Sequence, residues 1–143
     1  MLSLQLVTLN GTKSKSDVFE VLLPTPQGQI GVSENHAPLI SLASPGIIKV
    51  RVKPNDPDDF MDAYATNGGV IEIADNIVRV LVDEADDPDE INEQEALRAQ
   101  EEAKNLLKNA KDQVSLSHAQ SLLDRSGIRL KVVELKHRKR RHL

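Results

Sequence analysis

The sequence lacks cysteine and tryptophan, and its aromatic side chains are Phe19, Phe60 and Tyr64. Without cysteine there can be no disulfide, no thiolate metal ligand and no cysteine nucleophile. So few aromatic rings cannot form a stacking platform for bases or sugars, and the core must consist of Val, Ile, Leu and Ala. The chain also has no run of about 18 apolar residues and no basic start of a signal peptide, so we expect a cytosolic protein without a membrane span.

Charge is strongly segregated along the chain, although the net charge is only -4. Residues 83–95 hold eight acidic residues and no basic one, whereas residues 136–142, the basic tail, hold five Lys or Arg and two His. Three interpretations of the tail stay open: a solvated terminal cluster, contact with an acidic protein surface, and binding of RNA or anionic lipid. The acidic remainder of the chain opposes a polyanion, which disfavours the last of these.

Residues 1–86 predict a β-sandwich domain. Short runs in which every second residue is apolar are separated by turn residues at intervals of about ten, which is typical of an all-β sandwich or barrel. The alternating apolar sets are Leu2, Leu4 and Leu6, then Ile48, Val50 and Val52, then Val78, Val80 and Val82. The breaks between runs, such as Asn67-Gly68-Gly69, supply residues that accept positive φ and predict roughly eight to ten strands.

Residues 87–143 predict an antiparallel two-helix hairpin. After residues 84–89 there is no glycine before Gly127 and no proline. Mostly small residues recur at spacings of three and four along both expected helices, and each set forms one narrow stripe. The two stripes are Ala96, Ala99, Ala103, Leu106 and Ala110, and Leu116, Ala119, Leu123, Ser126, Leu130 and Val133. Such a seam buries little apolar area, so the hairpin needs docking to persist and can open.

The helix ends are also indicated by the sequence. Pro88 fits the first turn of the first helix, with Asp87 as its cap. Ser117 and Gln120 resemble a capping box at the start of the second helix. Ser126 and Gly127 are expected to interrupt that helix, because serine and glycine are weak helix formers.

No pattern in the sequence predicts catalysis or a metal site. His36, close to Glu34 in a polar turn, has no Ser, Cys or second His at a spacing that suggests a triad. None of the remaining histidines joins acidic residues in a zinc or iron signature. Gly68-Gly69 lacks the pattern of a phosphate-binding loop. We therefore assign no catalytic residue and no metal, and an enzymatic role of the His36 turn stays the third alternative.

Several stretches carry a family resemblance, and they occur in order along nearly the whole chain. They are Gly28-Gln-Ile-Gly-Val-Ser-Glu-Asn-His-Ala-Pro-Leu39, Ser44-Pro-Gly46 with the run 47–52, Asn67-Gly-Gly-Val-Ile-Glu-Ile73, and Arg129-Leu-Lys-Val-Val-Glu-Leu135. Together they resemble the epsilon subunit of rotary, F-type ATP synthases. The resemblance implies a non-catalytic subunit of the central stalk of a proton-translocating ATP synthase. It also implies a peripheral position on the cytoplasmic side of a bacterial cell membrane, with membrane contact only through the complex.

The resemblance implies a division of labour between the two domains. The sandwich would bind the gamma subunit and the c-ring and couple rotation to ATP synthesis. The hairpin would extend toward the alpha and beta subunits in a second state and restrain ATP hydrolysis there. No nucleic-acid partner is implied. The alternative function is a small RNA-associated module that uses the basic tail.

The resemblance also marks candidate site residues. The c-ring-facing loop comprises Gln29, Ile30, Glu34 and His36, and Gln29 stands where the family often has an acid. The inhibitory tail comprises Lys136, Arg138, Lys139, Arg140 and Arg141, with an acidic segment of the beta subunit as its partner. Glu95 and Arg98 match part of an ATP-sensing motif. Because Gln94 lacks that motif's apolar anchor, the match argues against bound ATP, and we assign no cofactor.

Overall fold

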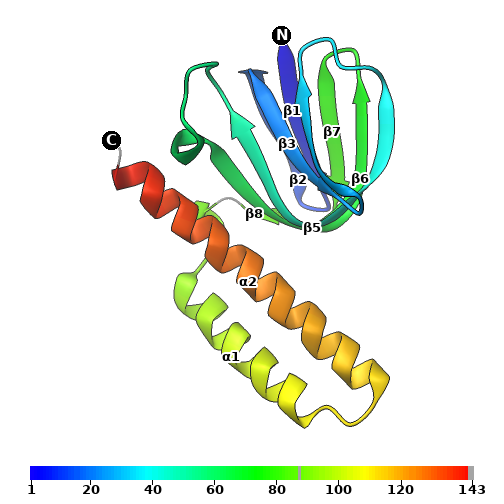
Figure 1. The fold of residues 1–143 in the computed structure, drawn as a ribbon, viewed down its shortest axis with the longest axis vertical. Helices are drawn as coiled ribbons and strands as arrows, with labels where there is room; N and C mark the ends of the chain where they lie inside the picture. The colour runs from blue at the N-terminus through cyan, green and yellow to red at the C-terminus, as the bar shows by residue number, and fades with distance from the viewer. Residues whose placement is uncertain (87, 142–143) are drawn as a thin grey trace.

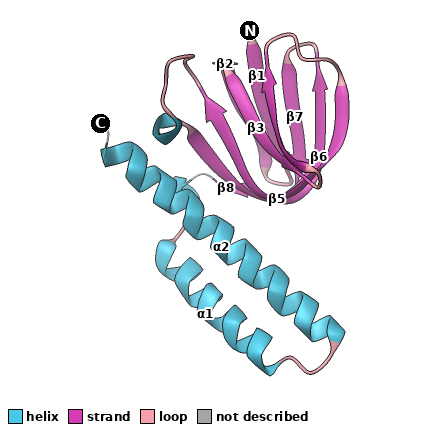
Figure 2. Ribbon diagram, in the orientation of Figure 1, coloured by secondary structure: helices cyan, strands magenta, loops and turns pink. Residues whose placement is uncertain are grey.

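The computed structural model describes residues 1–86 and 88–141, which form a β-sandwich followed by a helical hairpin (Figure 1). The sandwich comprises β1 (Leu2–Thr8), β2 (Gly11–Val18), β3 (Glu20–Thr25), β4 (Gly28–Ser33), β5 (Leu39–Arg51), the short helix η1 (Asp58–Phe60), β6 (Asp62–Ala74), β7 (Ile77–Val82) and β8 (Ala85–Asp86). The hairpin region comprises η2 (Pro88–Glu90), α1 (Glu93–Asn109) and α2 (Gln113–Arg141). This is the fold class that the sequence predicts (Figure 2).

The strands form one sheet that folds over on itself. Their order is β2-β1-β7-β6-β5-β3-β4, and β8 pairs with β6. The pairing of β1 with β7 is parallel, and the other pairings are antiparallel. Strands β5 and β6 each have 13 residues. The C-terminal end of β5 pairs with β3, and the second half of β6 pairs with β7. The two long strands therefore connect both layers of the sandwich.

The long strands bend at a pair of glycines. The ladder between β5 and β6 runs from Ala43–Gly69 to Pro45–Asn67 with no pairing in between. Gly68 has φ +98° and Gly69 has φ +153°, a region that disfavours L side chains. A Cβ atom on Gly69 would lie 2.0 Å from the carbonyl oxygen of Leu81. Glycine is therefore required where β6 approaches β7.

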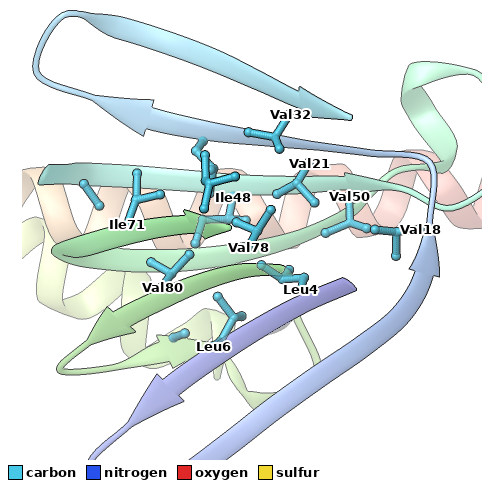
Figure 3. Close-up of a cluster of buried hydrophobic side chains, with 14 of the residues drawn as sticks. Leu4, Leu6, Val18, Val21, Val32, Ile48, Val50, Ile71, Val78 and Val80 are labelled. Carbon is cyan, nitrogen blue, oxygen red and sulfur yellow. The ribbon is translucent and has the colours of Figure 1, made fainter. Parts of the chain in front are cut away.

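The main core lies between the two layers and follows the alternation seen in the sequence (Figure 3). Leu2, Leu4 and Leu6 are each 1% exposed, and Val78 and Val80 are fully buried. Ile48 and Val50 are also fully buried, whereas Val52 is partly buried and packs against the cluster from its edge. All members of this core come from residues 2–85, so none of the described hairpin residues belongs to it.

The first helix begins later than the sequence predicts. Pro88–Glu90 form a single 3-10 turn, and α1 starts at Glu93 with Asn92 as its cap. The Asn92 side chain accepts a hydrogen bond from the Glu95 amide at 3.1 Å. Helix α1 begins late because Ile91 packs into the interface with the sandwich, where it is 8% exposed. The predicted cap, Asp87, lies outside the described residues.

The second helix starts earlier than predicted and is not interrupted. Asp112 caps α2, because its carboxylate accepts a hydrogen bond from the Ser115 amide at 2.7 Å, and this backbone bond lowers the pKa of Asp112. The prediction that Ser117 and Gln120 form a capping box at the start of this helix is therefore wrong. The helix also continues through Ser126, whose hydroxyl donates to the Leu123 carbonyl at 3.0 Å, and through Gly127, which needs no special backbone conformation there.

Candidate interaction surfaces

The hairpin docks on the sandwich through a second, smaller apolar cluster. Helix α2 lies between α1 and the sandwich and contacts the outer face of β5 and β6 (Figure 1). The buried members are Ala63, Ala65, Ile91, Ala96, Val132 and Val133. Because side chains alternate along a strand, Ala63 and Ala65 face the hairpin while Tyr64 packs against the main core. The sandwich contributes Ala63 and Ala65 of β6 and the partly buried Ile47 of β5, so the hairpin is held by a small apolar cluster.

Within the hairpin itself, part of the predicted seam is formed. Ala96, Ala103, Ala119 and Ser126 are each 5% exposed or less. Ala99 and Leu106, by contrast, are exposed, and Leu106 is 50% exposed. The exposed stretch lies along a groove of about 290 Å³ between the two helices. The hairpin is therefore a loosely closed pair of helices.

Ion pairs surround the apolar contact between the hairpin and the sandwich. Arg129 of α2 donates to Asp86 at 2.9 Å and lies 3.9 Å from Glu84. Glu84 also pairs with Arg125. Toward the end of α2, Lys136 pairs with Asp89 and Lys139 pairs with Asp62. The acidic segment and the basic helix end thus meet within one chain, and exposed or half-exposed pairs of this kind contribute modestly to stability.

Asp62 is the most strongly engaged of these acids. One carboxylate oxygen accepts from Lys139 of α2, and the other accepts from Lys15 of β2. Partial burial acts to raise the pKa of Asp62, but the hydrogen bonds from the two lysines outweigh it, and the pKa lies below its ordinary value. Asp62 therefore stays ionised at neutral pH and joins the hairpin to two strands.

The structure places the candidate inhibitory tail on the surface of its own chain. Lys136 and Lys139 bind sandwich or linker acids, and Arg138 pairs with Glu134 one turn earlier at 2.8 Å. Arg140 is exposed. The side chain of Arg141 and residue His142 lie outside the described residues. The described part of the tail thus pairs with acids of its own chain, and contact with an acidic surface of a partner protein stays a prediction.

The four residues of the candidate c-ring-facing loop do not form one loop. Gln29 and Ile30 lie at the start of β4, and Ile30 packs against the main core. Glu34 and His36 follow the end of the same strand, roughly 15 Å away for a strand of this length. Glu34 binds the amino terminus at 2.5 Å, and the His36 Nδ1 atom lies 2.6 Å from the Ala37 carbonyl oxygen. The structure therefore brings Gln29 together with Ile30, but not with Glu34 and His36.

The two candidate ATP-sensing residues are also separated. Glu95 lines the groove between the helices, together with Arg125 and Arg129 from α2. Arg98 is exposed and is not among the groove-lining residues. Arg125 and Arg129 are already engaged by Glu84 and Asp86, as described above. An ATP-sensing role of Glu95 and Arg98 stays a prediction.

One surface escaped the sequence analysis. Leu42, Val70 and Leu81 are 63%, 41% and 44% exposed. They are direct cross-strand neighbours, because Leu42 pairs with Val70 and Val70 pairs with Leu81. These three residues, here called the apolar strip, lie on neighbouring positions of β5, β6 and β7. The signal was present in the sequence: the run 77–82 is nearly all apolar, as expected for a strand covered on both faces.

Within the described residues, none of the helices has the length and apolar character that a membrane span requires. In the same part of the chain, no group of His, Asp or Glu side chains is arranged to hold a metal ion.

A sandwich with one bare apolar strip, carrying an ion-paired and loosely packed hairpin, is the architecture of a small subunit that works through protein contacts. Two family models match the chain in succession. The beta-sandwich domain of the ATP synthase Delta/Epsilon chain matches residues 1–88, and the long alpha-helix domain of that chain matches residues 89–134. The chain therefore belongs to the delta/epsilon chain family of ATP synthases and is a non-catalytic subunit of that complex.

Individual relatives agree with this assignment. The chloroplastic ATP synthase epsilon chain of Cucumis sativus is 35% identical over 132 residues, which cover 92% of this chain and 95% of the relative. The ATP synthase epsilon chain of Staphylococcus aureus (strain Newman) is 32% identical over 136 residues, which cover 94% of this chain and 98% of the relative. No relative of this kind supports the RNA-binding alternative.

A solved structure shares the fold. A chain in the Euglena gracilis mitochondrial ATP synthase, determined as an assembly of OSCP, F1 and c-ring, matches with a TM-score of 0.74 and 22% identity. The match covers 92% of this chain and 79% of that chain. The relatives thus come from chloroplasts, bacteria and mitochondria.

Proposed function

We propose that this chain is the central-stalk subunit that couples c-ring rotation to ATP synthesis and restrains ATP hydrolysis through its hairpin. Its structural neighbours belong to assemblies of F1 with the c-ring and of the central stalk with the c-ring, which supports this position in the complex. We further propose that the chain works at the cytoplasmic side of a bacterial cell membrane, bound to it only through the complex.

The apolar strip is the proposed contact with the gamma subunit. Three adjacent large apolar side chains on a flat outer sheet face form the kind of patch that marks a protein interface. A charge in the middle of this patch would have to be buried without a partner, which strongly weakens binding.

The test of this contact is co-purification with gamma. Val70→Asp should abolish co-purification of the chain with gamma, because Val70 is the central member of the strip. Val114→Asp is the matched control, since Val114 is 81% exposed on the hairpin and lies far from the strip in the sequence. If the Val70 variant still binds gamma as well as the control, the strip is not the interface.

The observation that carries the regulatory part of the proposal is the weak docking of the hairpin. A small apolar cluster and partly exposed ion pairs hold α2 on the sandwich, and this cluster has fewer buried members than the main core. Two packings of similar free energy are what a switching element requires. Lys136 and Lys139 are paired with the chain's own acids in the docked state, so these contacts compete with an acidic partner for the same lysines.

Two variants should therefore change hydrolysis in opposite directions. Asp62→Asn removes the sandwich partner of Lys139 and keeps all tail charges, so it should favour the extended hairpin and strengthen inhibition. Replacement of Arg138, Lys139, Arg140 and Arg141 with alanine also removes the Asp62 contact but deletes the inhibitory charges, so it should relieve inhibition.

ATP hydrolysis by the assembled enzyme measures both effects. If both variants shift hydrolysis in the same direction, the tail charges only hold the hairpin in place and do not inhibit. The direction of the Asp62→Asn effect alone distinguishes docking from inhibition, because that variant leaves the tail sequence unchanged.

We also propose that residues 1–86 form an independent domain and that residues 87–143 are the regulatory part. Within the part of the chain that the structure describes, the main core contains no hairpin residue, which supports the division. A chain that ends at Asp87 should fold and bind gamma, as circular dichroism and co-purification would show. Loss of the sandwich fold in this truncated chain would contradict the division.

A further inference from the structure

A cavity of about 340 Å³ lies between the C-terminal end of α2 and the start of β6. It is lined by four cationic side chains, namely Lys15, Lys136, Lys139 and Arg140, and by two acidic ones, Asp62 and Asp89. The lining thus carries an excess of two positive charges. Met61, Ala63 and Leu135 supply an apolar wall, and Met61 is only 6% exposed. The cavity therefore combines an apolar wall with a net positive charge.

The lysines in the cavity keep donors available. Lys15 and Lys139 each donate to a different oxygen of Asp62. An ammonium group has three N–H donors, so each lysine retains donors after this bond is made. Arg140 adds a planar guanidinium, and within residues 1–86 and 88–140 no carboxylate is paired with it. A doubly charged anion with several acceptor oxygens would satisfy these donors and neutralise the excess charge.

We propose that this cavity binds a phosphate group, either as free phosphate or on a small phosphorylated molecule. The volume is at the lower end of about 300–1,000 Å³ that is usual for small-molecule sites, which fits a phosphate with a small organic part. The binding cations come from two units, Lys15 from β2 and the other three from α2. The bound phosphate contacts both the sandwich and the hairpin.

A phosphate that contacts both the sandwich and the hairpin also affects whether the hairpin is docked. A ligand that contacts both units binds the docked state more tightly and shifts the population toward it. This consequence rests on the proposed function, in which the hairpin can leave the sandwich. Binding itself requires only the docked structure, so a binding measurement tests the site even if the hairpin has no regulatory role.

The chain contains two internal reporters for such a measurement. Its methionines are Met1 and Met61, and Met61 lines the cavity, whereas Met1 is 73% exposed and is not among the cavity-lining residues. Tyr64 is the sole tyrosine of the chain, tryptophan is absent, and Tyr64 is also among the cavity-lining residues. Methyl NMR of methionine and tyrosine fluorescence therefore both report on this site.

The experiment titrates the full-length chain with inorganic phosphate and, separately, with glycerol 3-phosphate at constant ionic strength. We expect a saturable shift of the Met61 methyl signal without a shift of Met1. Tighter binding of glycerol 3-phosphate would identify a phosphate ester as the ligand, and equal binding would identify the phosphate group alone. Absence of a saturable Met61 shift with either compound at millimolar concentration would overturn the proposal.

Variants separate a built site from general charge attraction. Lys139→Gln with Arg140→Gln should weaken binding by about tenfold or more. Lys108→Gln with Lys131→Gln makes the same change in net charge on the hairpin outside the cavity and should leave binding unchanged. Lys15→Gln tests the site from the sandwich side without altering the hairpin, and it should also weaken binding. Equal weakening in the control pair would overturn the proposal.

Discussion

The docking of the hairpin can be perturbed at one buried side chain of α2. Val132 is fully buried in the cluster between α2 and the sandwich. Val132→Ala removes the equivalent of two methylene groups from this cluster. At about 0.8 kcal/mol for each buried methylene group, the docking free energy should weaken by about 1.6 kcal/mol. A cavity that does not collapse adds to this cost. Because about 1.4 kcal/mol corresponds to a tenfold change, the docked-to-undocked ratio should fall by somewhat more than tenfold.

Val114→Ala provides a matched control on the same helix. Val114 is 81% exposed, so the same change there removes no buried contact. Both substitutions raise helix propensity slightly, and this effect cancels in the comparison. Any difference between the two variants therefore reports on the contact of Val132 with the sandwich.

Amide hydrogen exchange, followed by mass spectrometry, measures the effect. An undocked hairpin has only its narrow small-residue seam, so its amides should exchange faster when docking is weakened. The Val132 variant should lose about tenfold protection in α2, while β1 and β7, which belong to the separate main core, should keep theirs. Equal protection in both variants would refute the role of this contact. Loss of protection in β1 and β7 would show that the two units unfold together.

Three further outcomes follow from the geometry. Gly69→Ala places a Cβ atom against the Leu81 carbonyl and should lower the free energy of unfolding of the sandwich by about 3 kcal/mol or more, measured by chemical denaturation. Gly127→Ala meets no neighbouring atom and should raise helix stability by about 0.5–1 kcal/mol, seen as slower hydrogen exchange in α2. The pKa of Asp62 is lowered in the folded state, so its stabilisation is present above the ordinary value of 3.8 and is lost as the pH falls through the lowered value. Hairpin hydrogen exchange, followed from neutral pH to about pH 3, should show this loss in the native chain and not in Asp62→Asn.

The strands and the main core could be predicted because a buried strand face has a period of two. Leu4 and Val80 alternate with polar or exposed neighbours, and both are buried as this pattern requires. The strand break expected at Asn67-Gly68-Gly69 is wrong, because β6 runs from Asp62 to Ala74 through these residues, although both glycines have the positive φ that the sequence predicts. The alternation and the positive φ depend on neighbours in the sequence, which is why a single sequence reveals them.

Features that depend on distant contacts were not predicted correctly. Ile91 packs on the sandwich and delays α1, so a plausible cap before Pro88 gave the wrong start. Helix α2 passes through Gly127 because docking and seam contacts on both sides outweigh the low helix propensity of glycine. The separation of Gln29 from Glu34 along β4 was likewise hidden, because a sequence motif can span both ends of one strand.

The outer faces of β5 and β6 explain how one small sandwich can serve two partners. One half of these strands presents Ala63 and Ala65 of β6 and Ile47 of β5, and the chain's own hairpin covers it. The other half, beyond the bend at Gly69, presents the apolar strip. A large apolar residue gives more binding free energy than alanine, since the free energy follows the apolar area removed from water. The same two strands therefore combine a strong contact, suited to a permanent partner, with a weak contact, suited to an element that must leave.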